Sequence, residues 1–158
     1  MPEKTVWGIH AGSNGDSHDQ FMKNEVIALG WGKIGQLSLL NPEREAFREK
    51  LIQVYPGRKS GAYSAWAGEL YRFAYEINIG DIVVYPSKFQ RQIHICRIEG
   101  GYKYDPSQRR ANVYPVTWLI ELPRSYFSQG ALKETGNRLS FFRIKKFADE
   151  FLNSVSRV

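Results

Sequence analysis

The chain has 158 residues, of which 42% are hydrophobic and 24% are charged, and its formal net charge is +6. This composition is typical of a soluble globular protein, and we expect a single domain over residues 1–158. A basic surface favours polyanionic partners such as nucleic acids. The only cysteine, Cys96, excludes an intrachain disulfide and a cysteine-based zinc site, and it predicts a buried thiol in a reducing cytoplasm.

No apolar segment approaches the length of a membrane span, and the first residues, Met1-Pro2-Glu3-Lys4, lack the apolar core of a signal peptide. We therefore expect a cytoplasmic protein with no membrane partner.

The first third of the chain predicts two strands, at 5–10 and 26–31, separated by a loop of small residues and a short helix near 19–23. Asn41 and Pro42 then predict the start of a helix that ends near Val54, because Asn is a favoured N-cap and Pro suits the first helical position.

The rest of the chain predicts a helix over 64–76, strands over 82–85, 92–98 and 113–121, and a final helix over 145–155. At least five strands, with helices inserted early and placed last, predict an α+β domain around a strongly curved mixed sheet or a small barrel.

Motifs for catalysis are missing from the sequence. It contains no Walker motif, no His-Glu-x-x-His, no Gly-x-Ser-x-Gly and no dinucleotide fingerprint. The histidines have no metal-ligand spacing, and Glu69 and Glu76 look solvated on their helix. We expect no enzyme activity, no cofactor and no metal.

Two tryptophans next to glycines suggest a site for a flat ligand. Trp7 precedes Gly8, and Trp31 lies between Gly30 and Gly32. Glycine beside a large ring lets a ligand approach the backbone, and two rings can sandwich a flipped base. His10, Ser13, Asn14 or Asp16 would supply polar edges. The alternative for Trp7 is ordinary packing in the core.

A second candidate site is the turn after the strand at 82–85. Tyr85-Pro86-Ser87-Lys88 and Arg91 bring an aromatic ring, a hydroxyl and two cations together, the groups that line a pocket rim and hold a phosphate. The alternative is a plain hairpin loop. Further candidate phosphate ligands, each of which could instead be a solvated charge, are Arg58, Lys59, Arg109 and Arg110.

Three segments together resemble EVE domains, which belong to the PUA-like superfamily and are related to YTH domains. These segments are Gly80-Asp81-Ile82-Val83-Val84-Tyr85-Pro86-Ser87, then residues 93–106 with their Tyr-x-Asp-Pro turn, and Arg138-Leu139-Ser140-Phe141-Phe142-Arg143-Ile144. A subgroup at the N-terminus of Mrr-type restriction endonucleases is still more similar. The similarity to this subgroup lies in Trp7-Gly8-Ile9-His10-Ala11-Gly12, in residues 27–32 and in residues 127–132.

This resemblance implies a small pseudo-barrel that reads a modified base in an aromatic cage. Carried over by position, the cage would draw on Trp7, His10, Ala11, Gly12, Trp31, Trp66, Tyr85, Pro86 and Ser87. Trp66 also lies on the apolar face of its helix, which favours core packing. The resemblance further implies a role in restriction or defence, with a nuclease domain or an effector protein as partner, and the chain is either a stand-alone sensor or a domain of a longer protein.

The sequence leaves three functions open. The first is a module that flips a modified base of DNA into an aromatic pocket. The second is a module that reads a modified base in RNA, and the third is a sensor for a small nucleobase-like molecule.

Overall fold

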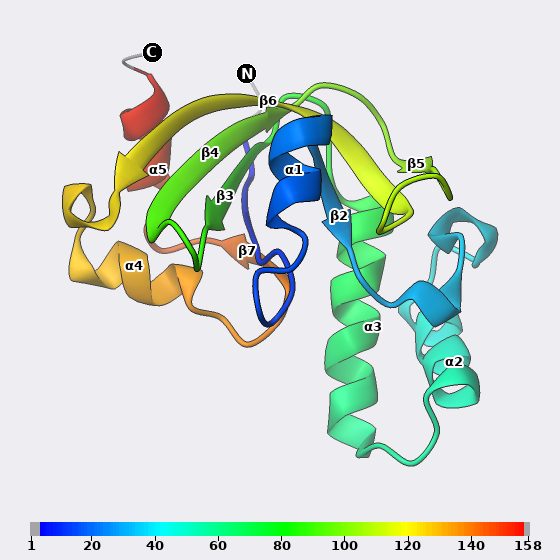
Figure 1. Ribbon diagram of the computed structural model, residues 1–158. Helices are drawn as coiled ribbons and strands as arrows, with labels where there is room; N and C mark the ends of the chain where they lie inside the picture. The colour runs from blue at the N-terminus through cyan, green and yellow to red at the C-terminus, as the bar shows by residue number, and fades with distance from the viewer. Residues whose placement is uncertain (1–3, 157–158) are drawn as a thin grey trace.

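The computed structural model describes residues 4–156. Its central element is a strongly curled mixed sheet (Figure 1). The strands follow the order β2-β6-β4-β3-β1-β7, and β5 pairs with β6. β1 and β3 are parallel, and the other pairs are antiparallel. The strands are β1 Val6–Ile9, β2 Val26–Leu29, β3 Ile82–Pro86, β4 Gln92–Ile98, β5 Lys103–Tyr104, β6 Asn112–Pro123 and β7 Phe141–Ile144.

The curl of the sheet follows from β6, which arches over the molecule in Figure 1. Its first residues pair with β2 and its remaining length pairs with β4. The register shifts between Ile95 and Cys96, so that Leu119 is an extra residue on β6. Such a bulge bends a strand and increases its twist, and the sheet therefore forms half of a barrel.

Five α-helices flank the sheet in the described part of the chain (Figure 1). They are α1 His18–Asn24, α2 Arg44–Val54, α3 Ser60–Tyr75, α4 Gln129–Thr135 and α5 Ala148–Val155, and short 3₁₀ turns lie at Gly32–Ile34, Leu37–Leu39 and Arg124–Tyr126. α2 and α3 form a hairpin whose connecting loop lies far from the sheet. The predicted α+β class is confirmed.

Both faces of the central strands are buried. Val6 of β1 packs in a cluster with Phe127 and Phe151, beside α4 and α5. Its neighbour Trp7 packs in a larger cluster with Phe73 of α3. Successive side chains of a strand point to opposite faces. Because both faces are buried here, the sequences of these strands are continuous apolar runs and do not alternate between apolar and polar residues.

Several predicted boundaries are wrong for local reasons. α2 begins at Arg44 rather than after Asn41, because the carbonyl of Asn41 accepts the N–H of Glu43 in a turn. α3 begins at Ser60, four residues before the predicted start at 64, since the carbonyl of Lys59 already accepts helical hydrogen bonds.

The last helix begins at Ala148, three residues later than the predicted start at 145. The N–H groups of Lys145, Lys146 and Phe147 instead donate to the carboxylate of Glu134 at 2.8–3.0 Å. The expectation for Cys96 is confirmed, because its thiol is fully buried.

Candidate nucleic-acid interface

Trp7 is a core residue, and the predicted base sandwich between Trp7 and Trp31 is wrong. Its side chain is 2% exposed. One ring face stacks on Phe141, with ring centroids 4.9 Å apart, and Nε1 donates to Asp81 at 3.0 Å. An indole enclosed in this way has no free face for a ligand.

Tyr85 and Ala11 are also buried, so they do not line an open cage as predicted. The Tyr85 ring stacks near His94, and its hydroxyl bonds to His18 Nδ1 at 2.7 Å. Burial raises the pKa of Tyr85 well above its ordinary value. The residues after Tyr85 in this turn therefore line a cavity, whereas Tyr85 itself does not.

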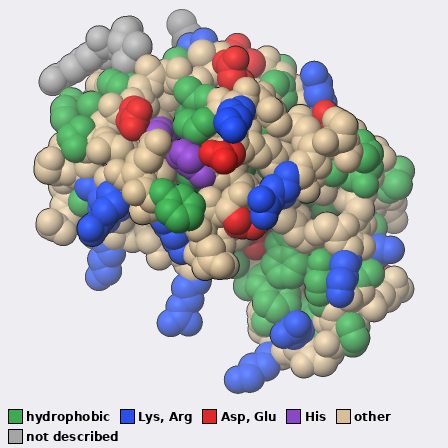
Figure 2. All heavy atoms as spheres, in the orientation of Figure 1, with side chains coloured by type: hydrophobic (Ala, Val, Ile, Leu, Met, Phe, Trp, Pro, Cys, Tyr) green, Lys and Arg blue, Asp and Glu red, His purple; other side chains and the backbone are tan. Residues whose placement is uncertain are grey.

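Trp31 is half-buried and has a left-handed backbone, with φ 67°. That conformation is unfavourable for a bulky side chain and often accompanies function. The Trp31 ring contacts the rings of Trp66, at 5.0 Å between centroids, and Tyr55, at 5.3 Å. No base fits between rings this close, so only an outer ring face can stack. Figure 2 shows hydrophobic side chains at the surface over α3.

A buried carboxyl lies next to this aromatic group. Glu69 is 1% exposed, although its sequence position predicted a solvated side chain. It accepts the N–H of Phe141 at 3.0 Å. Burial raises the pKa of Glu69 to about 7, against hydrogen bonds from the main chain and from the Trp31 side chain.

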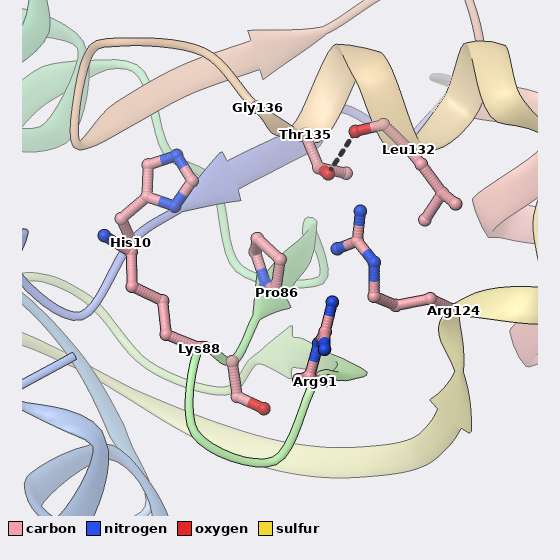
Figure 3. A pocket seen from close by; sticks show the side chains of 9 residues that line it. His10, Pro86, Lys88, Arg91, Arg124, Leu132, Thr135 and Gly136 are labelled. Atoms are coloured by element: carbon pink, nitrogen blue, oxygen red, sulfur yellow. Dashed lines mark hydrogen bonds between the residues drawn. The ribbon is translucent and has the colours of Figure 1, made fainter. Parts of the chain in front are cut away.

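The turn after β3 opens onto a cavity of about 310 Å³ (Figure 3). Lys88, Arg91 and Arg124 line it together with His10 and Pro86. Figure 3 shows the side chains of Arg91 and Arg124 next to each other in this cavity. Within residues 4–156, no carboxylate lines the cavity, so it favours an anion.

His10 is neutral in this cavity. Its Nε2 lies 3.0 Å from the carbonyl oxygen of Asn137, which can only accept, so Nε2 carries the proton. Burial, more than the charge of Lys88, lowers the pKa of His10. Nδ1 of the neutral ring is therefore a hydrogen-bond acceptor.

A second cavity of about 370 Å³ adjoins the first and shares His10, Lys88 and Gly136 with it. It is lined further by Gly12, Ser13 and Arg138. The Lys88 ammonium donates to the carbonyl of Ser13 and so links the two walls of the cavity.

Arg110 lines a third cavity, of about 400 Å³, and its guanidinium lies beside Gly12 of the second cavity. A Cβ atom on Gly12 would lie 2.9 Å from the Arg110 guanidinium, and one on Gly30 would lie 3.5 Å from it. The Asp16 carboxylate lies closer still to the Gly12 position, so this carboxylate and the Arg110 guanidinium together fill the space beside Gly12, and the guanidinium lies beside Gly30. We call this space, between Gly12, Gly30 and Arg110, the glycine cleft.

Asp16 is the nearest carboxylate to the glycine cleft. It pairs with Arg109 at 2.9 Å and with Arg110 at 3.9 Å. The Arg110 guanidinium has no hydrogen bond to another residue in the described chain, although its side chain is largely buried. It therefore has donors available for a ligand.

The first two cavities share lining residues, and the third lies next to them where Arg110 approaches Gly12; we call the lining of the three cavities the basic face. Its cations are Lys88, Arg91, Arg109, Arg110, Arg124 and Arg138. No Asp or Glu among residues 4–156 lines these cavities.

A family model for a domain of unknown function, DUF8426, matches residues 7–145. The chain belongs to this family. No functionally curated protein matches it in sequence. The part that matches DUF8426 contains the whole basic face and the glycine cleft.

The basic face gathers most of the predicted phosphate ligands but not all of them. Arg58 and Lys59 lie at the start of α3, at the end remote from the sheet, and line none of the three cavities. Among the predicted pocket residues, His10, Gly12, Ser13, Gly32, Pro86 and Ser87 do line them, whereas Trp31 and Trp66 form a separate aromatic pair.

Sequence reasoning missed Arg124 and Arg138. Arg124 directly follows the end of β6, and Arg138 precedes β7. A cation at the end of a strand could have pointed to Arg124, but only the tertiary fold places it opposite Arg91.

None of the described helices has the length and apolar character needed to cross a membrane. No group of three His, Cys, Asp or Glu side chains within residues 4–156 is arranged to hold a metal ion.

Proposed function

We propose that this chain is a non-catalytic module that binds nucleic acid along the basic face and holds one modified base at the glycine cleft. The observation that carries the proposal is the group of neighbouring cavities whose lining contains six cations and, among the described residues, no carboxylate, with Asp16 beside them paired to Arg109 and Arg110. Lys and Arg side chains on such a surface neutralise phosphates and release counterions. Figure 2 shows Lys and Arg side chains projecting along the lower edge of the molecule, some of them over the loop between α2 and α3, outside the basic face.

The glycine cleft is the proposed position of the base. It already accommodates two flat groups, the Asp16 carboxylate against Gly12 and the Arg110 guanidinium against Gly12 and Gly30. Trp31 directly follows Gly30 and offers a partly exposed indole for stacking. Stacking on an aromatic side chain is worth about 1–3 kcal/mol, which offsets an unstacking cost of a few kcal/mol.

Arg110 would then bind the base and not a phosphate. When a base enters the cleft, the guanidinium moves aside and donates its free N–H groups to the edge of the base. Arg favours acceptors such as the O6 and N7 atoms of guanine. Asp16, at 3.9 Å, holds the displaced guanidinium close to the cleft.

The resemblance to EVE domains supports the finer part of this proposal. The curled half-barrel and its flanking helices are compatible with a PUA-like fold, and Gly12 and Gly30, which lie in two of the segments that carry the resemblance, border the same guanidinium. We therefore propose an EVE-type fold in a restriction or defence protein, with modified DNA as the ligand and a nuclease domain or effector as a partner.

The test is a binding screen with duplexes that differ only in one base, which carries a methyl, hydroxymethyl or glucosyl group or no modification. RNA with the same modified base is measured in parallel. We expect tighter binding to one modified DNA, with an affinity that falls steeply as salt rises. Equal affinity for every duplex would contradict the proposed recognition of a modified base. Tighter binding to the RNA would show that the ligand is RNA and not DNA.

A small-molecule sensor is the second candidate, because the cavity at Arg91 and Arg124 measures about 310 Å³ and ligand pockets span about 300–1,000 Å³. Free nucleotides added in the same screen separate the two functions. Tight binding of a nucleotide that hardly changes with salt would favour the sensor.

A further inference from the structure

Phe89 is one of the most exposed large hydrophobic side chains of the described chain, with 71% of its surface accessible. It lies in the turn between β3 and β4, with Lys88 before it and Arg91 two residues after it. A single exposed apolar residue is common on protein surfaces. The surroundings of Phe89 distinguish it from such a residue.

The Phe89 ring rests on a backbone that lacks a side chain. Gly15 has φ 71°, and a Cβ atom built on it would lie 2.9 Å from Phe89 Cε2. The ring is therefore supported on one side by the β1–α1 loop, while most of its surface remains in solvent. A rigid ring with a free face is suited to stacking.

The turn that carries Phe89 is attached to the β1–α1 loop. The Lys88 ammonium donates to the carbonyl of Ser13. Arg91 has a left-handed backbone, with φ 54°, and its N–H bonds to the carbonyl of Ser87, which closes the turn. The position of Phe89 relative to the basic face is thus set by hydrogen bonds.

A single β-turn joins Phe89 to the glycine cleft. Gly15 N–H donates to the carbonyl of Gly12 at 3.1 Å, and the ends of such a turn lie within about 7 Å of each other. Gly12 contacts the Arg110 guanidinium at one end, and Gly15 contacts the Phe89 ring at the other. The turn thus spans at most about two base steps, since bases in a strand lie about 3.4 Å apart.

We infer that Phe89 is a wedge that enters the base stack of a duplex at the place from which the base has been extruded. This inference rests on the proposed function. Apolar side chains such as Phe and Leu are inserted between base steps by other DNA-binding proteins. The ring replaces the stacking that the extruded base loses, while Lys88 and Arg91 hold the phosphates on either side.

The test compares a duplex with a single strand that carries the same modified base. In a single strand no stack has to be held open, so the wedge contributes only in the duplex. Phe89→Ala should weaken duplex binding about 5- to 150-fold and leave single-strand binding within about twofold. Phe89→Leu should retain most of the duplex affinity, since Leu also acts as a wedge.

Leu39→Ala is the control, because Leu39 is 78% exposed and lies in a different part of the fold. It should bind both ligands as the wild type does, and thermal melts should be similar for all variants. Wild-type protein that binds neither ligand would contradict the proposed function itself. Wild-type binding with unchanged duplex affinity for Phe89→Ala would overturn only the wedge, as would an equal loss on both ligands.

Discussion

The Glu69 carboxyl of α3 accepts the main-chain N–H of Phe141, the first residue of β7, at 3.0 Å. The two residues are 72 positions apart in the chain. This bond joins the helix that carries Trp66 to the strand that covers Trp7. A buried carboxyl in this position couples the stability of the fold to its protonation.

Glu69 should make the protein less stable as the pH rises from about 4.5 to about 7. The pKa of Glu69 is raised from 4.5 to about 7 in the folded state, so the folded protein binds the proton more tightly than the unfolded chain. The stabilisation is complete below pH 4.5 and is lost as the pH passes about 7, by roughly 3 kcal/mol in total.

Glu69→Gln should remove this pH dependence, because the amide oxygen can still accept the N–H of Phe141 but cannot ionise. Chemical denaturation at a series of pH values measures the effect. Glu49→Gln, at an exposed position of α2, is the matched control and should keep the wild-type pH profile. A wild-type profile for Glu69→Gln would show that Glu69 does not ionise in this range.

Arg124 should contact phosphate, although its sequence position did not predict this. Arg124→Ala should weaken binding to modified and unmodified duplexes alike and reduce the slope of log affinity against log salt by about one. Lys59→Ala is the control, because it removes one positive charge outside the basic face. Equal slopes for the two variants would contradict the assignment of the phosphate path to the basic face.

Local patterns predicted five of the seven strands among the described residues, because buried β-strands appear as short apolar runs between turn residues; β5 and β7 were not predicted from such runs. β3 and β4 lie where these runs do, at Ile82–Pro86 and Gln92–Ile98. The helix ends were less predictable, since the carboxylate of Glu134 caps the main chain ahead of α5 from a distant position. α4 was missed, because seven residues leave little periodicity to detect.

The candidate site was only partly predictable for a different reason. The glycines near Trp7 and Trp31 look alike in sequence, but Gly8 makes room for the Phe142 ring in the core, whereas Gly30 borders a cavity. Which glycine faces solvent is decided by the pairing of β1 with β7. Arg110 could not be placed in the glycine cleft from its sequence position for the same reason.

The protein should not cleave nucleic acid by itself. Metal-dependent cleavage needs carboxylates that hold a cation at the phosphate, and the described residues offer no such group. Incubation with modified plasmid and Mg²⁺ should leave the plasmid supercoiled on a gel. Nicking that persists through further purification and disappears with EDTA would contradict this expectation.

Substitution of Trp31 should weaken ligand binding without unfolding the protein. Trp31→Ala removes the proposed stacking face and should weaken binding to the preferred modified duplex about 5- to 150-fold. Unmodified duplex should lose less, because the phosphate contacts remain. Trp7→Ala is the contrasting variant: it empties part of the core and should cost about 3–5 kcal/mol of unfolding free energy.

Trp31→Gly adds a check on the backbone. Both substitutions delete the indole and should weaken binding equally, but residue 31 has φ 67°, which glycine adopts without strain. Trp31→Gly should therefore be about 1 kcal/mol more stable than Trp31→Ala. Calorimetric melts and binding measured on the same preparations test both statements. If Trp31→Ala kept the preference for the modified duplex, the base would be held away from Trp31, and the glycine cleft would have to bind it without stacking.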